Sequence, residues 1–500
     1  MGEKYDALMT RLRELQDVYM TASLLSWDQQ TQMPPGGANA RASQIATLSK
    51  IGHEMATSQE MGQLLANAAD EVAGMDYDSD AASTVRVMQQ DYEDNTKVPA
   101  SFVAEFAHLT SLSQSTWAQA RAAKDFSQFL PMLEKIIDMV RQSAEYLGYQ
   151  DHPYSALLNQ YERGITTTQV KQIFDDHKPG LVELISAIQE NADKVGDKIL
   201  HRPYDVDKQR EFAHKMISAF GFDFGRGYQA VSVHPFCTHF STNDVRLTSR
   251  FDPEFLNPAL FGMMHEAGHG MYEQGVSQTL EGTPMASGTS LGVHESQSRM
   301  WENLVGRSKG FWSWALPQLK ATFPQLDSVD LDTFYKAINK SAPTFIRVEA
   351  DEVTYNLHII LRFEIELELI SGTLAAKDAP DAWNVKFEEF FGLTPPDDAQ
   401  GILQDVHWSL GIQGYFPTYA LGNLLSVQYY NQAIKDCPDI PGDIANGKFN
   451  QLLGWLNQNI HQHGRKFTSD ELTRKVTGES IQSRDYLAYL KTKYGDIYGL

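Results

Sequence analysis

Two histidines and a glutamate form the clearest chemical motif in the sequence. Residues 265–269 read HEAGH, which places His265 and His269 four residues apart with Glu266 beside the first. On a helix, both imidazoles then share one face and can bind one zinc ion, while the glutamate can act as a general base. Pro258 and Gly275 are typical of a helix start and stop, so we expect a helix over 258–274. The alternative is that both histidines only satisfy local hydrogen bonds.

A catalytic zinc site needs a third protein ligand, and the residues after HEAGH exclude one class of metalloprotease. Tyr272 and Gly275 stand where metzincins carry a glycine and a third histidine. Glu273 lies one further turn along the helix, but three side chains spaced along one straight helix diverge too far to surround one ion. A carboxylate from a following antiparallel helix fits a His₂Glu site better.

Residues 288–308 offer that carboxylate. They read GTSLGVHESQSRMWENLVGRS. This pattern predicts a glycine-containing loop followed by a helix that carries Glu295, Arg299 and Glu302 near one face. We favour Glu295 as the third ligand over Glu302. His294 is a minor alternative ligand, and it could instead support the site or bind a substrate carbonyl.

Composition narrows the possible partners and compartment. The 500 residues carry 42 Lys and Arg against 64 Asp and Glu, a formal charge of −22, which disfavours nucleic acids and anionic membranes. Cys237 and Cys437 are the only cysteines, so a reducing compartment fits. We find no run of 18 apolar residues and no secretory leader, and we therefore expect a cytoplasmic protein without a membrane partner.

Helical periodicity dominates the elements that must position these side chains. Apolar residues recur at i, i+3, i+4 and i+7 near 2–20, 40–57, 83–95, 100–122, 127–147, 168–194 and 207–220. Residues 227–251 instead alternate Val, Phe and Thr around STND, which predicts a small β-hairpin or three-stranded sheet. We expect one domain over 1–500, either a single body or two interleaved lobes, with 1–200 forming part of a groove wall and 201–500 carrying the metal site.

Several segments resemble the motifs of the carboxypeptidase Taq family of thermostable metallocarboxypeptidases. Five segments occur in the family's order: DVRLT (244–248), HEAGH (265–269), HESQSR (294–299), IRVEAD (346–351) and GILQDVHW (401–408). LSWDQQTQMPPGG (25–37), HPF (234–236) and GYFPTYALGN (414–423) also look like family segments. The resemblance runs from about residue 20 to the C-terminal region.

The resemblance implies a fold, a metal site and an activity. The fold would be mainly α-helical with a long, deep substrate groove, related to neurolysin and angiotensin-converting enzyme. His265, His269 and Glu295 would hold zinc or cobalt, with Glu266 as general base and proton shuttle. Members are typically homodimers that remove single C-terminal residues from peptides with broad specificity, by Glu-assisted attack of a metal-bound water.

Other motif residues are candidates for stabilising the transition state or binding the substrate. The oxyanion needs donors beyond the metal, and His407, Tyr415 and Tyr419 could supply them. His234 and Gln404, in HPF and GILQDVHW, are further candidate substrate contacts.

An exopeptidase must also hold a free carboxylate, for which arginine is suited. We expect Arg347 to open a long helix and to bind that carboxylate, oriented by Asp351, with Arg246 of DVRLT as the rival. Asp405, two residues before His407, is expected to fix a histidine tautomer.

Three functions therefore compete. The first is a metal-dependent carboxypeptidase. The second is an oligopeptidase of the same architecture that cuts internally. The third, disfavoured by the presence of Glu266, is a non-catalytic helical binding protein.

Overall fold

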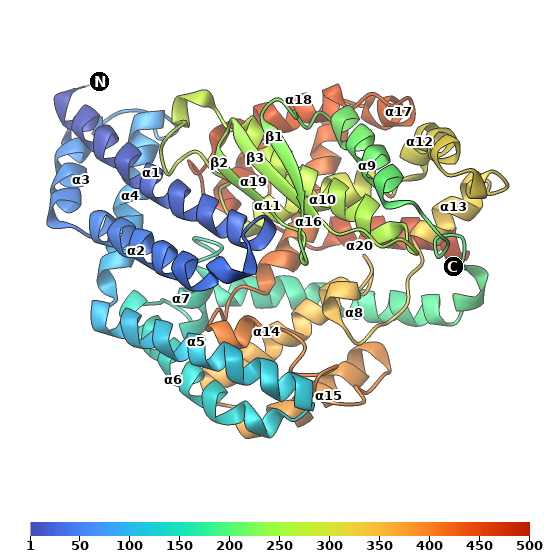
Figure 1. Ribbon diagram of the computed structural model, residues 1–500, viewed down its shortest axis with the longest axis horizontal. Helices are drawn as coiled ribbons and strands as arrows, with labels where there is room; N and C mark the ends of the chain where they lie inside the picture. The colour runs from blue at the N-terminus through green and yellow to red at the C-terminus, as the bar shows by residue number, and fades with distance from the viewer. Residues whose placement is uncertain (1) are drawn as a thin grey trace.

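Helices form almost all of the regular structure, which confirms the mainly α-helical fold predicted from the apolar spacing. The computed structural model describes residues 2–500 (Figure 1). The helices of the first half are α1 (Glu3–Thr31), α2 (Ala38–Ala56), α3 (Gln59–Val72), α4 (Asp80–Lys97), α5 (Ala100–Ala123), α6 (Leu130–Leu147), α7 (Pro153–Leu158), α8 (Thr167–Gln189), α9 (Val206–Phe220) and α10 (Asn257–Gly275).

The second half of the chain continues the helical pattern. Its helices are α11 (Leu291–Arg299), α12 (Lys309–Thr322), α13 (Leu331–Ile338), α14 (Tyr355–Ser371), α15 (Ala379–Phe391), α16 (Pro417–Asp436), α17 (Ile440–Ala445), α18 (Asn450–Asn459), α19 (Ser469–Thr477) and α20 (Arg484–Tyr498). Short segments at functional positions are the π-helix η5 (Met300–Val305) and the 3₁₀ helices η7 (Arg347–Glu349) and η9 (His407–Leu410).

The predicted helix over 258–274 is α10, and most other predicted helices end within a few residues of the observed ends. The largest difference concerns α1, which was expected over 2–20 and continues to Thr31. Residues 21–31 contain no helix-breaking residue, whereas Pro34 and Pro35 follow after only two further residues. The helix therefore extends until the first strong breaker.

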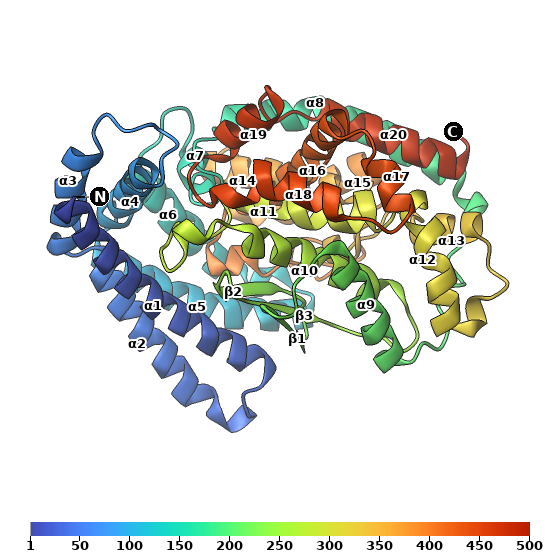
Figure 2. The ribbon, with the colours of Figure 1, turned by 90° about the horizontal axis from the view of Figure 1, so that it is seen from above.

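The β-rich stretch forms a three-stranded sheet, which decides between the two predicted arrangements. Its strands are β1 (Gly227–Val231), β2 (Cys237–Ser241) and β3 (Asp244–Ser249), in the order β1-β3-β2. β1 runs parallel to β3, with Gly227 opposite Val245, and β2 runs antiparallel to β3, with Cys237 opposite Leu247. β1 and β2 are thus the two edges, and β2 faces α1 in both views (Figures 1 and 2).

Two hydrophobic clusters organise the packing. The smaller one combines buried residues of α1, α3 and α4 with Val276, Leu280, Met285 and Ala286, which follow α10. The larger one runs from Ala120 to Tyr498. Figure 1 accordingly shows α1–α4 on one side of the sheet and α12 and α13 on the other. The expected division into lobes near residue 200 stays a prediction.

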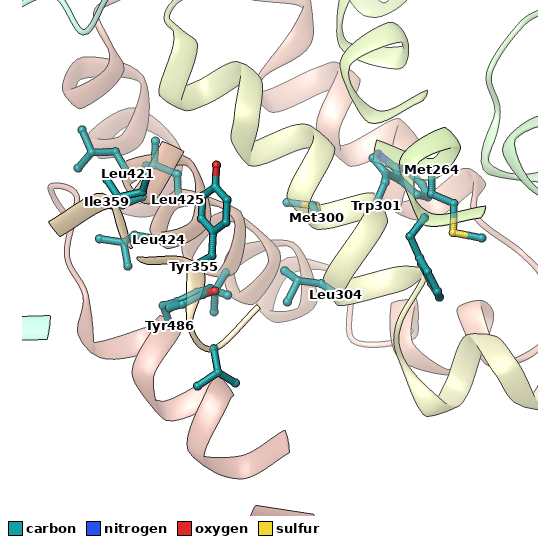
Figure 3. Close-up of a cluster of buried hydrophobic side chains, with 14 of the residues drawn as sticks. Met264, Met300, Trp301, Leu304, Tyr355, Ile359, Leu421, Leu424, Leu425 and Tyr486 are labelled. Carbon is teal, nitrogen blue, oxygen red and sulfur yellow. The ribbon is translucent and has the colours of Figure 1, made fainter. Parts of the chain in front are cut away.

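One part of the larger cluster lies where η5 meets α14 and α16. Figure 3 shows Met300 and Leu304 facing the region where Leu421, Leu424 and Leu425 project from α16. All five side chains are at most 5% exposed. Apolar burial of this kind stabilises by about 25 cal/mol per Å², so η5, which continues directly from the helix with the predicted third ligand, is anchored by its apolar side chains. In the described residues 2–500, no helix is both long and apolar enough to cross a membrane.

Candidate metal centre and active site

Two neighbouring helices bring the predicted metal ligands together. His265 and His269 lie one turn apart on α10, and Glu295 lies on α11. Glu295 Oε2 is 3.6 Å from His265 Nε2 and 3.5 Å from His269 Nε2. One ligand atom from each residue lies within 4.8 Å of the other two, which makes this a group able to hold one metal ion. The arrangement is a His₂Glu donor set.

Glycines allow the helices around Glu295 to approach closely. A Cβ at Gly268 of α10 would lie 2.6 Å from the carbonyl oxygen of Gln297 and from the Cα of Ser298. A Cβ at Gly422 of α16 would lie 2.5 Å from the Cβ of Glu295. Glycine costs about 1 kcal/mol relative to alanine inside a helix. Here it permits α11 to pack between α10 and α16, so the glutamate is held from both sides.

The outer nitrogen of His265 is held by Glu302. His265 Nδ1 lies 3.0 Å from Glu302 Oε2. Arg299 and Arg307 donate to the same carboxylate, at 3.3 and 3.2 Å. Burial by itself would raise the pKa of Glu302, but its hydrogen bond to His265 and the charge of Arg299 lower it to about 2. Glu302 is therefore a charged partner of His265 Nδ1, the ring nitrogen that faces away from Glu295.

His269 and Glu295 are held in a comparable way. His269 Nδ1 lies 2.7 Å from His294 Nδ1, and Arg299 Nε donates to Glu295 Oε1 at 2.7 Å. Burial would raise the pKa of Glu295, but Arg299 and His265 outweigh it and keep the pKa well below the usual range. The Nε2 atoms of both histidines and Oε2 of Glu295 are the atoms that converge. This donor set fits a divalent cation, because its inner atoms face one another while its outer atoms are bonded to the protein.

The rival third ligands have other partners. Glu302 lies in η5, where the widened π-helical turn follows α11, and it contacts the opposite nitrogen of His265. Glu273 faces His294 rather than the converging atoms. His294 contacts His269 through Nδ1, as the predicted supporting residue would.

Glu266 is buried beside this group. It is 6% exposed, and burial raises its pKa to about 7, which is in the range suited to a general base near neutral pH. The sheet lies close by, since Glu266 and Glu273 both contribute to raising the pKa of the Cys237 thiol on β2 after burial itself. α10, the helix that carries the predicted base, packs against β2 and β3.

An aromatic group carries the other predicted catalytic side chains. The ring centres of Tyr415 and Tyr419 lie 5.3 Å apart, and the ring of His407 lies tilted against that of Phe416 with the ring centres 4.4 Å apart. Burial raises the pKa of both tyrosines, and the charge of Glu295 raises each further. Both hydroxyls therefore stay protonated near the metal centre. Burial lowers the pKa of His407 to about 4, so its ring is neutral at physiological pH.

Arg347 is held by a carboxylate other than the expected one. Its Nη2 and Nε donate to Asp405 Oδ1 at 2.8 and 3.1 Å, and Arg362 Nε donates to Asp405 Oδ2 at 2.7 Å. Burial would raise the pKa of Asp405, but the two guanidinium groups keep it well below the usual range. Asp405 was expected to fix a histidine tautomer. That expectation is wrong, because its carboxylate is shared by two arginines and lies 4.0 Å from His407 Nδ1.

Asp351 does not orient Arg347. Its carboxylate accepts hydrogen bonds from the hydroxyl of Ser341 and from three backbone N–H groups, those of Ala342, Val353 and Thr354. The chain turns there, so Arg347 lies in η7 and the following helix α14 begins only at Tyr355. The expected long helix opening at Arg347 is therefore wrong. The physical reason is that the Asp351 side chain accepts hydrogen bonds from backbone N–H groups and so competes with the hydrogen bonds of a helix.

The side-chain amide of Gln404 is hydrogen-bonded to backbone groups of the protein. Its Oε1 accepts the backbone N–H of Arg347 at 2.8 Å, and its Nε2 donates to the carbonyl oxygens of Phe345, Gln400 and Gly401. All of its polar atoms thus contact the backbone. Those bonds tie the loop before α14 to the segment at 400–404. The direct substrate contact expected of Gln404 stays a prediction.

The two predicted residues of the sheet region make contacts with their own neighbours. Arg246 on β3 forms a bidentate pair with Asp244, with contacts of 2.8 and 2.9 Å, and its guanidinium lies 4.4 Å from the ring centre of Trp27. His234 lies exposed in the loop between β1 and β2, where its carbonyl oxygen accepts from Ser232.

Three hollows follow α1 past the sheet. The first, about 360 Å³, is lined by His239 and Tyr19. The second, about 520 Å³, is lined by Tyr19, Cys237 and Trp27, and the third, about 370 Å³, by Trp27 and Arg246. Because neighbouring hollows share Tyr19 or Trp27, they form a row along α1.

Sequence reasoning missed Tyr355, which connects the group around Arg347 with the group around the metal ligands. Its hydroxyl accepts from Arg347 Nη1 at 2.8 Å, and its ring lies 4.7 Å from the guanidinium of Arg299. Arg299 in turn binds Glu295. The only signal available was the position of Tyr355 a few residues after IRVEAD. Arg362, which shares Asp405 with Arg347, was also missed.

Comparisons with known proteins identify the family of the chain. The family model for carboxypeptidase Taq (M32) metallopeptidase matches residues 7–494. The thermostable carboxypeptidase 1 of Thermus thermophilus is 40% identical over 504 residues, covering 99% of each chain, and carboxypeptidase 1 of Bacillus subtilis is 36% identical, covering 97% of each. The crystal structure of an M32 carboxypeptidase from Deinococcus radiodurans superposes with a TM-score of 0.97 at 41% identity, covering 100% of both chains. With its His₂Glu group, its buried glutamate and these relatives, the chain belongs to the carboxypeptidase Taq (M32) family of metallopeptidases.

Proposed function

We propose that this metallocarboxypeptidase removes single residues from the C-termini of peptides, using one divalent metal ion held by His265, His269 and Glu295. The observation that supports the site is the convergence of three ligand atoms within 4.8 Å, while the outer atoms of the same residues are hydrogen-bonded to the protein. The family and its named carboxypeptidases support the reaction.

The donor set suits zinc, and cobalt is the alternative. Two imidazole nitrogens and one carboxylate oxygen form the ligand set of catalytic zinc sites, and cobalt accepts the same atoms. When bound there, the metal would acidify a water molecule and polarise the scissile carbonyl. Measuring the metal content of the purified protein, and the activity restored to the chelated protein by each ion, tests this assignment.

Glu266 would move the proton in the reaction. Its carboxylate takes a proton from the attacking water and passes it to the amine that leaves when the peptide bond breaks. No net proton is gained, and the products are a shortened peptide and a free amino acid. Burial supports this role, because it raises the pKa of Glu266 to about 7.

Tyr415, Tyr419 and His407 would stabilise the negative charge on the carbonyl oxygen. Both tyrosine hydroxyls stay protonated because burial raises their pKa, and both lie close enough to Glu295 for its charge to contribute. Such donors are worth about 2.7–4 kcal/mol each when aimed at the developing oxyanion.

Arg347 would bind the terminal carboxylate of the substrate. It shares one carboxylate, that of Asp405, with Arg362, so the cluster of these three charges carries one excess positive charge. Burial makes that charge strongly attractive to an anion. Tyr355 and Arg299 link Arg347 to Glu295, whereas Arg246 is paired with Asp244 on the sheet. These contacts favour Arg347.

Replacing Glu266 with Gln tests the mechanism. We expect kcat to fall by about 10²–10⁴-fold, the usual contribution of a positioned acid–base group. Metal content is expected to stay at the wild-type level, because the three ligands are untouched. Full peptidase activity in this variant would refute the role of Glu266. If the wild-type protein bound no metal and cleaved no peptide, the binding-protein alternative would stand.

Amidation of the substrate separates the carboxypeptidase from an internally cutting oligopeptidase. Matched peptides with a free or an amidated C-terminus differ only in the carboxylate that Arg347 would bind. We expect the amidated peptide to be cleaved at least about 10-fold more slowly, since a hydrogen bond to a charged group is worth ~1.5–3 kcal/mol. Equal rates would instead support the oligopeptidase.

The assembly and compartment are expectations that complete the proposal. The resemblance implies a homodimer, and the composition favours the cytoplasm, with peptides rather than nucleic acids as partners. Sedimentation at several protein concentrations tests the dimer.

A further inference from the structure

We propose that Glu273 and His294 form a positioning relay that orients His269 and keeps the lone pair of its Nε2 directed toward the metal position. The inference rests on the proposed metal site. It concerns two residues that do not themselves contribute a converging ligand atom. Glu273 lies on α10, one turn beyond His269, and His294 lies on α11 directly before Glu295.

The relay is continuous in hydrogen-bond distance. Glu273 Oε1 lies 2.6 Å from His294 Nε2, and His294 Nδ1 lies 2.7 Å from His269 Nδ1. The His294 ring is additionally flanked by the ring of Tyr272, with ring centres 5.0 Å apart. The imidazole thus has a partner at each nitrogen and an aromatic neighbour.

The order of donors and acceptors follows from the carboxylate. An ionised carboxylate only accepts hydrogen bonds, so His294 must carry its proton on Nε2. In the His294 tautomer with its proton on Nε2, Nδ1 accepts, and His269 must donate from its own Nδ1. His269 Nε2 is consequently left with its lone pair, and this is the atom that lies 3.5 Å from Glu295 Oε2.

Glu273 is itself held firmly. It is 2% exposed, and its Oε1 also accepts from the backbone N–H of Gly288 and the hydroxyl of Ser287, at 3.3 and 3.4 Å. Its Oε2 lies 3.4 Å from Nδ1 of His239 on β2, a residue that lines the hollow of about 360 Å³ beside α1. The relay therefore runs from the edge of the sheet to the metal position.

The two metal histidines are supported differently. His265 Nδ1 contacts the carboxylate of Glu302 directly, whereas His269 reaches the carboxylate of Glu273 only through a second imidazole. A carboxylate behind a ligand histidine fixes its tautomer and ring orientation. With His294 between them, the same effect requires both residues to be present.

Metal affinity of the variants Glu273→Gln and His294→Phe tests the relay. We expect the dissociation constant for zinc, measured by competition with a chelator, to rise about 10–100-fold in each, the range seen when such supporting partners are lost. The double variant should bind zinc as tightly as the single variant with the lower zinc affinity, because the two residues act in series. Affinity within twofold of wild type, or additive losses, would overturn the proposal.

A matched control separates this effect from general destabilisation. Glu366 is also a fully buried carboxylate, and it accepts from Tyr154, Trp408 and Gly414 without contacting the metal residues. Glu366→Gln is expected to lower the unfolding temperature while zinc affinity stays at the wild-type value. A loss of zinc affinity equal to that of His294→Phe would mean that destabilisation alone explains the result.

The tautomer can be measured without any metal or substrate. In metal-free protein labelled with ¹⁵N-histidine, above neutral pH, His269 should show a protonated Nδ1 and an unprotonated Nε2, with its signals identified by their loss in His269→Gln. His294→Phe should give a mixture of tautomers. A proton on Nε2 of wild-type His269 would refute the relay even if the peptidase activity is as proposed. Conversely, the expected tautomer in a protein without peptidase activity would refute only the proposed function.

Discussion

At the scale of single residues, the charged groups of this site are paired before any substrate is present. Glu295 is bonded to Arg299, Glu302 to His265, and Arg347 to Asp405. A buried charge is costly unless it is paired and hydrogen-bonded. Such pairing explains how the site can keep its geometry in the absence of ligand, and it identifies the cluster around Arg347 as the one with an unbalanced positive charge.

Arg347→Met is expected to weaken substrate binding without unfolding the protein. Asp405 keeps Arg362 as its partner, so no carboxylate is left alone. We expect KM for a free-carboxylate peptide to rise about 10–100-fold, the value of a hydrogen bond to a charged group. Steady-state kinetics measure this, with Arg246→Met as the matched control. A larger rise in KM for Arg246→Met would assign the carboxylate to Arg246 instead.

At the scale of elements, the spacing between helices decides where the third ligand lies. α11 is packed between α10 and α16, and it can approach both because Gly268 and Gly422 face it without side chains. Its continuation, η5, is anchored by the apolar cluster around Met300 and Leu421 (Figure 3). Close-packed cores transmit a small displacement rather than absorbing it.

Gly268→Ala should therefore affect both stability and metal binding. Its Cβ would lie 2.6 Å from the backbone at Gln297 and Ser298, so α11 must move and carry Glu295 with it. We expect a loss of about 1–3 kcal/mol in the free energy of unfolding, together with weaker zinc binding. Denaturant unfolding and chelator competition measure the two effects.

Gly262→Ala is the control on the same helix. A Cβ at Gly262 meets no atom within 4 Å, so alanine should gain up to about 1 kcal/mol from helix propensity and leave zinc affinity unchanged. If Gly268→Ala behaved like Gly262→Ala, the close approach of α10 and α11 would not control the position of Glu295.

At the scale of the whole molecule, the large core imposes a pH dependence on stability. His177 and His461 are both fully buried, and burial lowers their pKa to about 4 and about 3, from 6.5. Above pH 6.5 both are neutral in the folded and unfolded chain, and their contribution to stability is complete. As the pH falls below 6.5 the unfolded chain binds protons that the folded protein does not, so stability is lost until the folded pKa is reached.

His177→Gln should reduce the acid sensitivity of the metal-free protein. The pKa difference of His177 corresponds to about 3 kcal/mol of unfolding free energy lost between pH 6.5 and 4. Its Nε2 accepts from Asn356, a role that a glutamine oxygen can also perform. Unfolding curves across this pH range should be flatter for His177→Gln than for His108→Gln, whose histidine is exposed on α5. Equal slopes would contradict this origin of the acid sensitivity.

The sequence by itself determined the helical architecture, the extent of α10 and the pairing of HEAGH with a glutamate on the next helix. These features depend on local spacing: apolar residues recur with the helical period, and two histidines four apart must share a face. The choice of Glu295 over Glu302 also started from spacing. In the structure Glu295 Oε2 lies within 3.6 Å of both Nε2 atoms, whereas Glu302 contacts Nδ1 of His265.

Only the tertiary structure decided which charged and polar groups meet. Asp405 rather than Asp351 pairs with Arg347, 58 residues away in the chain, and Glu273 reaches His269 only through His294 on another helix. Ion pairs and hydrogen bonds are specified to within a few tenths of an ångström, whereas periodicity places a residue only on a face. The partners of the buried charges therefore depend on how the helices pack, and spacing along the chain does not contain that information.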